Sequence, residues 1–180
     1  KPREIQAWTG FDFPGRNNKY SDFKWNSSHF DGTDLDEATG EKQIFLFEGK
    51  EWVNETDSEN VNFDYLMGAN VDMENPEVIE ELTRWGNWYY DQIHMDGLRL
   101  DAVKHIRFIF FRDWLRRFRE HAGRDIFAVG EYWSGELGKL LHYLDVTENS
   151  LRLFDVPLHY NFYNAGISDG AYDMRNLVSG

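Results

Sequence analysis

Two acidic residues each follow a short apolar segment, and one predicted βα unit separates them. Asp101 comes directly after residues 98–100, and Glu131 comes directly after the apolar run 126–130. Parallel strands carry active sites at their carboxyl ends, and neighbouring strands lie about 4.8 Å apart. Side chains converging from two such ends could bring their carboxyl groups to roughly 5 Å. A retaining glycosidase needs that spacing between its nucleophile and its proton donor.

The residues around Asp101 are of types that would support such chemistry. Arg99 lies two residues before Asp101, so in a strand the two side chains share a face. The guanidinium could then hold the carboxylate ionised and oriented, as a nucleophile requires. Lys104 and His105 follow in the loop beyond the strand, where they could hydrogen-bond a polar ligand.

Trp133 follows Glu131 by two residues, and an aromatic face is a good platform for a sugar ring. These patterns alone leave several interpretations open. The two acids could be solvated strand-end residues, Arg99 part of an ordinary ion pair, and Trp133 a packed ring. A magnesium-binding set, as in enolase-like barrels, would need acids on three successive strand ends, and Asp155 near the third strand keeps that alternative open.

The elements that would position these residues follow an alternating pattern after residue 75. Asn75 and Pro76 form an N-cap and first helical position, and the apolar spacing predicts helices and strands in alternation. We expect helices over 76–93, 106–121 and 137–144, strands over 98–100, 126–130 and 151–156, and a last helical start over 172–177. Strict alternation predicts an α/β fold with a parallel sheet, either doubly wound or part of a (β/α)8 barrel.

Residues 1–62 have a different character. They are rich in Gly, Asn, Asp, Ser and Thr interleaved with aromatic residues, and the clearest strand-like run is 43–47. A long, loop-rich segment of this kind is unlike an independent domain. It indicates a long loop that extends from a larger folded domain, and loops of this kind often carry function.

Composition excludes several classes of protein. The chain has 180 residues and a formal net charge of −13, which argues against binding to nucleic acid or to an anionic membrane. Hydrophobic residues make up 41%, enough for a core, but no apolar run approaches the roughly 20 residues of a membrane-spanning helix. Without cysteine, disulfides and thiolate metal sites are excluded.

Several segments, in order along the chain, resemble one enzyme family. Residues 96–105 (DGLRLDAVKH) resemble the nucleophile segment of the α-amylase family of glycoside hydrolases, and residues 130–133 (GEYW) resemble its acid/base segment. Residues 8–16, 29–34, 63–68, 154–160 and 172–175 are similar to the bacterial liquefying α-amylases.

The resemblance implies a fold and an activity. It implies a partial (β/α)8 TIM barrel with an irregular, β-rich inserted domain: residues 1–62 would form most of the insert, and 63–180 the barrel from its third helix to the start of its sixth. Asp101 would be the nucleophile and Glu131 the acid/base, while Arg99 would orient Asp101. Lys104 and His105 would bind sugar hydroxyls. The family's third catalytic Asp has no counterpart here, so we expect an internal fragment that is inactive alone.

The resemblance also implies structural Ca²⁺. Asp64 and the backbone carbonyl of His105 match ligands of the main site, where Asn70 replaces an Asp. Asp31 and Asp72 match additional metal positions, with Glu74 in place of an Asp. Val53 stands where another Asp is expected, so we expect one calcium rather than a full metal cluster. The alternative is that these acids form a solvated cluster near a helix N-terminus.

The function implied is retaining endo-hydrolysis of α-1,4-glucosidic bonds in starch, glycogen and related glucans, by a monomer that binds neither nucleic acid nor membrane. An exo-acting, malto-oligosaccharide-forming amylase or a transglycosylase would use the same scaffold. A non-catalytic glucan-binding relative would lack Asp101 or Glu131, and both are present. Localisation stays open, although residues 63–68 resemble the intracellular bacterial branch somewhat more than the secreted enzymes.

Overall fold

The computed structural model describes residues 2–59 and 67–179. The chain divides into two compact units, which are described one at a time. The first comprises Lys1–His94 with His105–Arg107, and the second comprises Met95–Lys104 with Phe108–Gly180. The predicted domain boundary at residue 62 stays a prediction.

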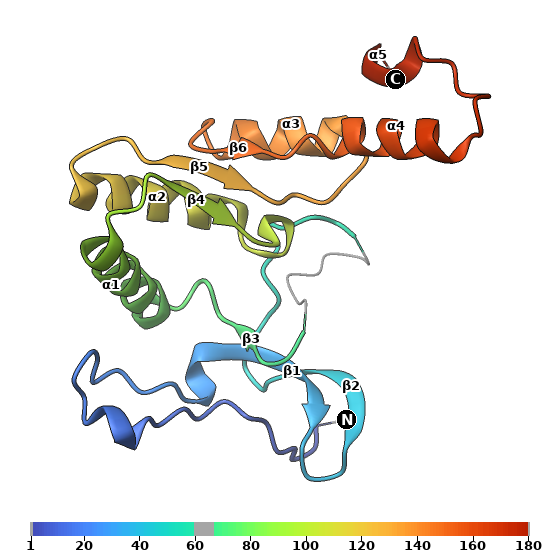
Figure 1. Ribbon diagram of the computed structural model, residues 1–180. Coiled ribbons are helices and arrows are strands. Elements are labelled where there is room, and N and C mark those ends of the chain that lie inside the picture. The colour runs from blue at the N-terminus through green and yellow to red at the C-terminus, as the bar shows by residue number, and fades with distance from the viewer. Residues whose placement is uncertain (1, 60–66, 180) are drawn as a thin grey trace. The chain divides into compact units, whose positions relative to one another are not determined.

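The first unit contains a small antiparallel sheet. Its strands β1 (Phe30–Asp36), β2 (Glu41–Leu46) and β3 (Asn70–Val71) lie in the order β2-β1-β3 (Figure 1). Short 3₁₀ turns, η1 (Pro14–Arg16) and η2 (Ser27–His29), precede it. The strand predicted over 43–47 is confirmed as part of β2. The sequence does not predict β1, because that strand reads FDGTDLD and lacks a regular apolar alternation.

Helix α1 (Pro76–Ile93) completes the first unit and begins where the sequence predicts. The side chain of Asn75 accepts a hydrogen bond from the backbone N–H of Glu77 at 2.9 Å, and Pro76 occupies the first helical position. The helix ends at His94, which adopts the left-handed conformation with φ of 48°. The N-cap and the helix predicted from the sequence are therefore confirmed.

The second unit is built on a parallel sheet. Strands β4 (Gly97–Leu100), β5 (Phe127–Gly130) and β6 (Arg152–Leu153) lie in the order β4-β5-β6. Helix α2 (Phe108–Ala122) connects the first two strands and α3 (Leu137–Val146) connects the next two (Figure 1). Two successive crossovers of the usual right-handed kind would place both helices on one face of the sheet, and α2 contacts α3. The predicted α/β organisation with a parallel sheet is confirmed.

After β6 the structure differs from the sequence-based expectation. The third strand covers only Arg152–Leu153, and α4 (Val156–Ile167) follows it directly. Asp155 caps α4 by accepting a hydrogen bond from the Leu158 N–H at 3.0 Å. The sequence does not predict this helix, because apolar, aromatic and amide side chains are mixed along it without a clear stripe. The last helix, α5, covers Asn176–Ser179 rather than 172–177.

Among the described residues, helix α2 contributes more buried apolar side chains to the second unit than any other helix or strand. Phe108, Leu115 and Phe118 are buried on α2, together with Ile126 and Ala128 around β5. The guanidinium of Arg119 donates to the carbonyls of Ile126 and Ser150 at 2.7 and 2.8 Å, which ties α2 to the chain just before β5 and β6. In the described parts of the chain, no helix has both the length and the apolar character needed to cross a lipid bilayer.

Candidate active site

The carboxyl ends of β4 and β5 are held in register where the two predicted catalytic acids begin. Leu100 pairs with Gly130 at the end of the β4–β5 register. The Glu131 N–H donates to the Leu100 carbonyl at 2.8 Å, and the Val103 N–H donates to the Glu131 carbonyl at 3.1 Å. Asp101 and Glu131 therefore leave the sheet side by side, as the strand-end argument predicts.

Arg99 contacts both carboxylates. Its Nη1 lies 2.8 Å from Oδ1 of Asp101, and its Nη2 forms a close ion pair with Oε2 of Glu131. A guanidinium is a rigid planar fork, so the two oxygens that it contacts are held beside each other. The Arg99 and Asp101 side chains are more than half exposed, and such pairs contribute little to stability. The value of this arrangement is the orientation of the two acids.

The backbone turns sharply directly after Asp101. Ala102 adopts a left-handed conformation with φ of 47°, which costs about 1–2 kcal/mol for a residue with a Cβ. The turn leads into the 3₁₀ segment η3 (Val103–His105). Strained backbone that persists in a folded protein is concentrated at functional sites, and this turn determines where the Asp101 carboxylate leaves the sheet.

Lys104 and Trp133 are linked within the second unit. Nζ of Lys104 donates to the backbone carbonyl of Trp133 at 3.0 Å, so the loops after β4 and β5 are joined. The Trp133 side chain is 44% exposed, which leaves ring area open to a ligand. His105 belongs to the first compact unit, and its Nδ1 is buried without a hydrogen-bond partner in the described part of the chain.

Two residues beside Trp133 were missed in the reading of the sequence. The rings of His159 and Tyr160, on α4, lie 5.1 and 6.3 Å from the Trp133 ring, centroid to centroid. The signal that could have found them is the Asp155-Val156-Pro157 cap sequence directly after the third strand. It starts a helix at the same sheet edge that carries Asp101 and Glu131.

The predicted calcium ligands of the first unit divide into two groups. Asp31 is buried, and the amide nitrogen of Asn70 lies 3.4 Å from its Oδ2. Asp72 instead pairs with Nζ of Lys50 at 2.6 Å, and Glu74 pairs with Arg107 at 3.2 Å. Asp64 lies outside the described residues. Among residues 2–59 and 67–179, no three His, Asp or Glu side chains are grouped closely enough to hold a metal ion.

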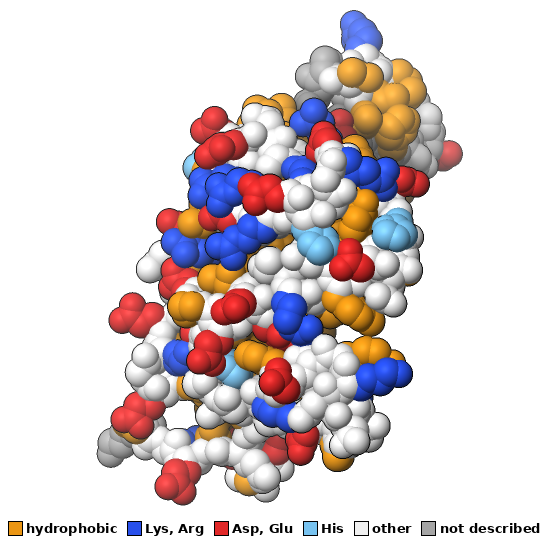
Figure 2. All heavy atoms as spheres, turned by 90° about the vertical axis from the view of Figure 1, so that its left-hand side faces the viewer, with side chains coloured by type: hydrophobic (Ala, Val, Ile, Leu, Met, Phe, Trp, Pro, Cys, Tyr) orange, Lys and Arg blue, Asp and Glu red, His pale blue; other side chains and the backbone are white. Residues whose placement is uncertain are grey.

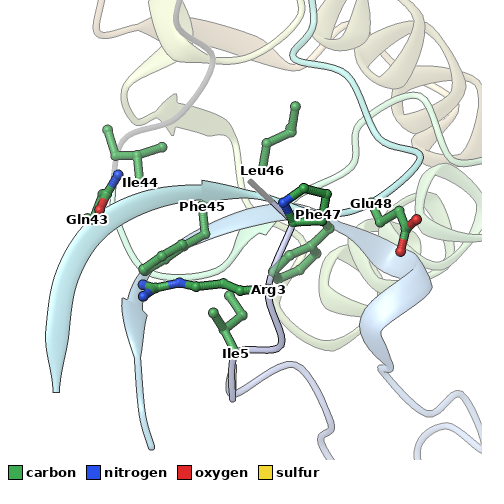
Figure 3. Close-up of a pocket in the computed structure, with 9 residues that line it drawn as sticks. Arg3, Ile5, Gln43, Ile44, Phe45, Leu46, Phe47 and Glu48 are labelled. Carbon is green, nitrogen blue, oxygen red and sulfur yellow. The ribbon is translucent and has the colours of Figure 1, made fainter. Parts of the chain in front are cut away.

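A cavity of about 680 Å³ lies elsewhere in the first unit, between the N-terminal segment and β2 (Figure 3). The Arg3 guanidinium lies over the Phe45 ring at 4.9 Å and pairs with Glu41 at 2.7 Å. The lining of this cavity contains none of the predicted catalytic or substrate-binding residues.

Known proteins match nearly the whole chain. It is 53% identical over 178 residues to an α-amylase of Geobacillus stearothermophilus, with 98% of this chain and 32% of that protein covered. It is 51% identical over 175 residues to an α-amylase of Bacillus licheniformis, with 97% and 34% covered. A cytoplasmic α-amylase of Escherichia coli is 41% identical over 181 residues, with 98% and 37% covered. No protein-family model matches the chain. The chain spans about a third of the length of these relatives.

Proposed function

Because the chain belongs to the α-amylase family of glycoside hydrolases, we propose that it forms part of an enzyme that cleaves internal α-1,4-glucosidic bonds of starch, glycogen and related glucans with retention of configuration. The observation that carries this proposal is the pair of carboxylates at neighbouring strand ends, both held by Arg99. The high identity to α-amylases supports it independently.

The two acids would have different roles. Asp101 would attack the anomeric carbon and form a glycosyl ester, while Glu131 would give its proton to the leaving glycosidic oxygen. In the second step Glu131 would take a proton from water, and that water would release the sugar from Asp101. The side chain of Glu131 is 25% exposed and that of Asp101 is 72% exposed.

Arg99 would orient the nucleophile toward the anomeric carbon. Trp133 would offer its exposed ring as a platform for a sugar, and Lys104 and His105 would bind sugar hydroxyls. For Lys104 the contact with the Trp133 carbonyl adds a second task, because it holds the loop that carries the platform.

The finer architecture is also a proposal. Residues 1–62 would form most of an irregular inserted domain, and 63–180 would form part of a (β/α)8 barrel from its third helix to the start of its sixth. The parallel order β4-β5-β6 with helices in the connections supports this assignment. The family's third catalytic Asp would come from outside this chain, so we expect the 180-residue chain alone to be inactive.

A structural Ca²⁺ fits part of the predicted donor set. Asp31 and Asn70 both carry hard oxygen donors of the type that Ca²⁺ binds, and Asp31 is 2% exposed. We propose that Asn70, with Asp64 and the His105 carbonyl, would hold the ion of the main site and stabilise the inserted domain, and that Asp31 would belong to an additional metal position. Asp72 and Glu74 would first have to give up Lys50 and Arg107. Calorimetric titration of the metal-free full-length protein with Ca²⁺ would count the sites.

The test of function uses the full-length protein and short maltooligosaccharides. Proton NMR during the first turnovers should show the α-anomer of the newly formed reducing end, because two displacements restore the configuration. Glu131→Gln should lower kcat by about 10²–10⁴-fold, the usual contribution of a general acid, and Asp101→Asn should lower it at least as much.

Lys139→Gln serves as a matched control, because half-buried Lys139 pairs with the exposed N-cap residue Glu136 at the start of α3, has no role in the proposed chemistry, and its loss should leave kcat unchanged. Initial release of the β-anomer would refute retention. Normal turnover by Asp101→Asn would remove the proposed nucleophile.

A further inference from the structure

The most informative unassigned feature near the acids is a cluster of three rings, Trp133, His159 and Tyr160. We propose that His159 is a positioning residue. Its imidazole would set the angle at which the Trp133 indole meets the sugar on the leaving-group side of the scissile bond. This inference rests on the proposed glycosidase function, and it identifies which residue controls one part of the same site.

The three rings contact one another in a triangle. The centroids of Trp133 and His159 are 5.1 Å apart with their planes inclined by 56°. His159 and Tyr160 are 5.5 Å apart at 63°, and Tyr160 and Trp133 are 6.3 Å apart at 68°. These distances and angles fall in the range of favourable edge-to-face packing. The indole orientation is therefore set by two rings from α4.

Further contacts hold Trp133, His159 and Tyr160 in place. A Cβ at Gly135 would lie 3.1 Å from the Tyr160 ring, so that ring rests directly on the backbone of the loop after β5. Lys104 holds the carbonyl of Trp133 at 3.0 Å. His159 lies in the first turns of α4, where its N–H donates to the Asp155 carbonyl at 3.0 Å. The imidazole is therefore presented to Trp133 by a capped helix rather than by a loose loop.

The strand order shows which part of the substrate this cluster would meet. Asp101 follows β4, Glu131 follows β5, and α4 follows β6, in a sheet ordered β4-β5-β6. Passing along the sheet edge, the substrate would meet first the proposed nucleophile, then the acid that protonates the leaving oxygen, and then the ring cluster. The triangle therefore lies on the side of Glu131 away from Asp101, where the leaving sugar would be.

The experiment compares two substrates in the full-length protein. One is maltoheptaose, which places sugars on both sides of the cleaved bond. The other is an aryl maltotrioside, whose nitrophenol leaving group carries no sugar. His159→Ala should lower kcat/KM for maltoheptaose by about 3- to 10-fold, the range expected for losing one aromatic contact. For the aryl substrate it should change kcat/KM by less than about twofold.

Two further variants separate positioning from a structural role. His159→Phe keeps a ring beside the indole and should restore most of kcat/KM for maltoheptaose. In a double-mutant cycle, His159→Ala should have little additional effect once Trp133 is Ala, because it acts through that ring.

The outcomes are distinct. Equal losses on both substrates, full additivity in the cycle, or unchanged maltoheptaose cleavage by His159→Ala would each overturn the positioning role while the proposed function stands. An unaltered full-length protein that cleaves neither substrate would overturn the proposed function, and this inference with it.

Discussion

Tyr143 on α3 carries a buried hydroxyl that lacks a hydrogen-bond partner in the described part of the chain. The side chain is fully buried, and its ring packs at 5.0 Å from Phe108 and 5.2 Å from Tyr132. Burial raises the pKa of the Tyr143 phenol far above its ordinary value of 10.0, because the phenolate would lose its hydration. We therefore expect Tyr143→Phe to stabilise the protein.

The magnitude follows from the cost of the unpaired group. A hydroxyl buried without a partner costs about 1–3 kcal/mol, and phenylalanine fills the same ring volume without leaving a cavity. The variant should raise the free energy of unfolding by about 1–2 kcal/mol. Urea denaturation of the full-length protein should show this as a higher midpoint with an unchanged slope, since a changed slope would indicate a different unfolded or native state.

Thr147→Val is the matched control, one turn further along the chain. Its hydroxyl donates to the Tyr143 carbonyl at 2.7 Å and is fully buried, so this variant removes a satisfied hydrogen bond with little change in shape. It should lower stability by about 1 kcal/mol. If Tyr143→Phe lowered the midpoint as Thr147→Val does, the Tyr143 hydroxyl would have a partner and the reasoning would be refuted.

Three further predictions concern single positions in either unit. Several hydrogen-bond donors hold the pKa of Asp36 below its ordinary value of 3.8, and the backbone N–H of Gln6 contributes most to this lowering. The ionised Asp36 therefore contributes its full stabilisation above pH 3.8, and this contribution is lost as the pH falls through the pKa of the folded protein. The free energy of unfolding, measured at a series of acidic pH values, should show the difference between the unaltered protein and Asp36→Asn shrinking below about pH 4. Gly32→Ala would place a Cβ 2.3 Å from the Phe45 carbonyl oxygen and should destabilise by about 3 kcal/mol or more in urea. Gly166→Ala meets open space within α4 and should instead stabilise by about 0.5–1 kcal/mol, measured in the same way.

Surface charge in the second unit is arranged in pairs. Arg112 contacts Asp113 at 3.1 Å and Glu148 at 3.3 Å, and Arg116 contacts Asp113 at 3.4 Å. On the face shown in Figure 2, basic side chains lie beside acidic ones over much of the surface. The basic side chains of this region therefore lie beside acidic partners, in a chain whose formal net charge is −13.

Sequence reasoning succeeded where local signals determine the structure. The Asn75-Pro76 cap and the helical spacing after it predict α1, and compact apolar runs predict β4 and β5. It missed β1, whose residues FDGTDLD include buried acids and a glycine. Gly32 there lies under the Phe45 backbone and the Trp52 ring, so the strand is stabilised by contacts distant in sequence. No local pattern reports such contacts.

In the candidate site, too, the contacts between residues distant in sequence were not predicted from the sequence. Topology alone predicts that Asp101 and Glu131 leave adjacent strand ends, since parallel strands share a carboxyl edge. The sequence assigned Arg99 to Asp101 only, because the two lie on one strand. Its contact with Glu131 depends on the register Arg99↔Val129 between β4 and β5. His159 contacts Trp133 from a third element, α4, which follows the next strand of the sheet. Each further βα unit at this sheet edge adds contacts that the sequence pattern does not predict. The strand ends and the strand period therefore predict where the two acids lie and that Arg99 lies beside Asp101. They do not predict the contacts of Arg99 with Glu131 or of His159 with Trp133, which depend on the strand register and on a third element.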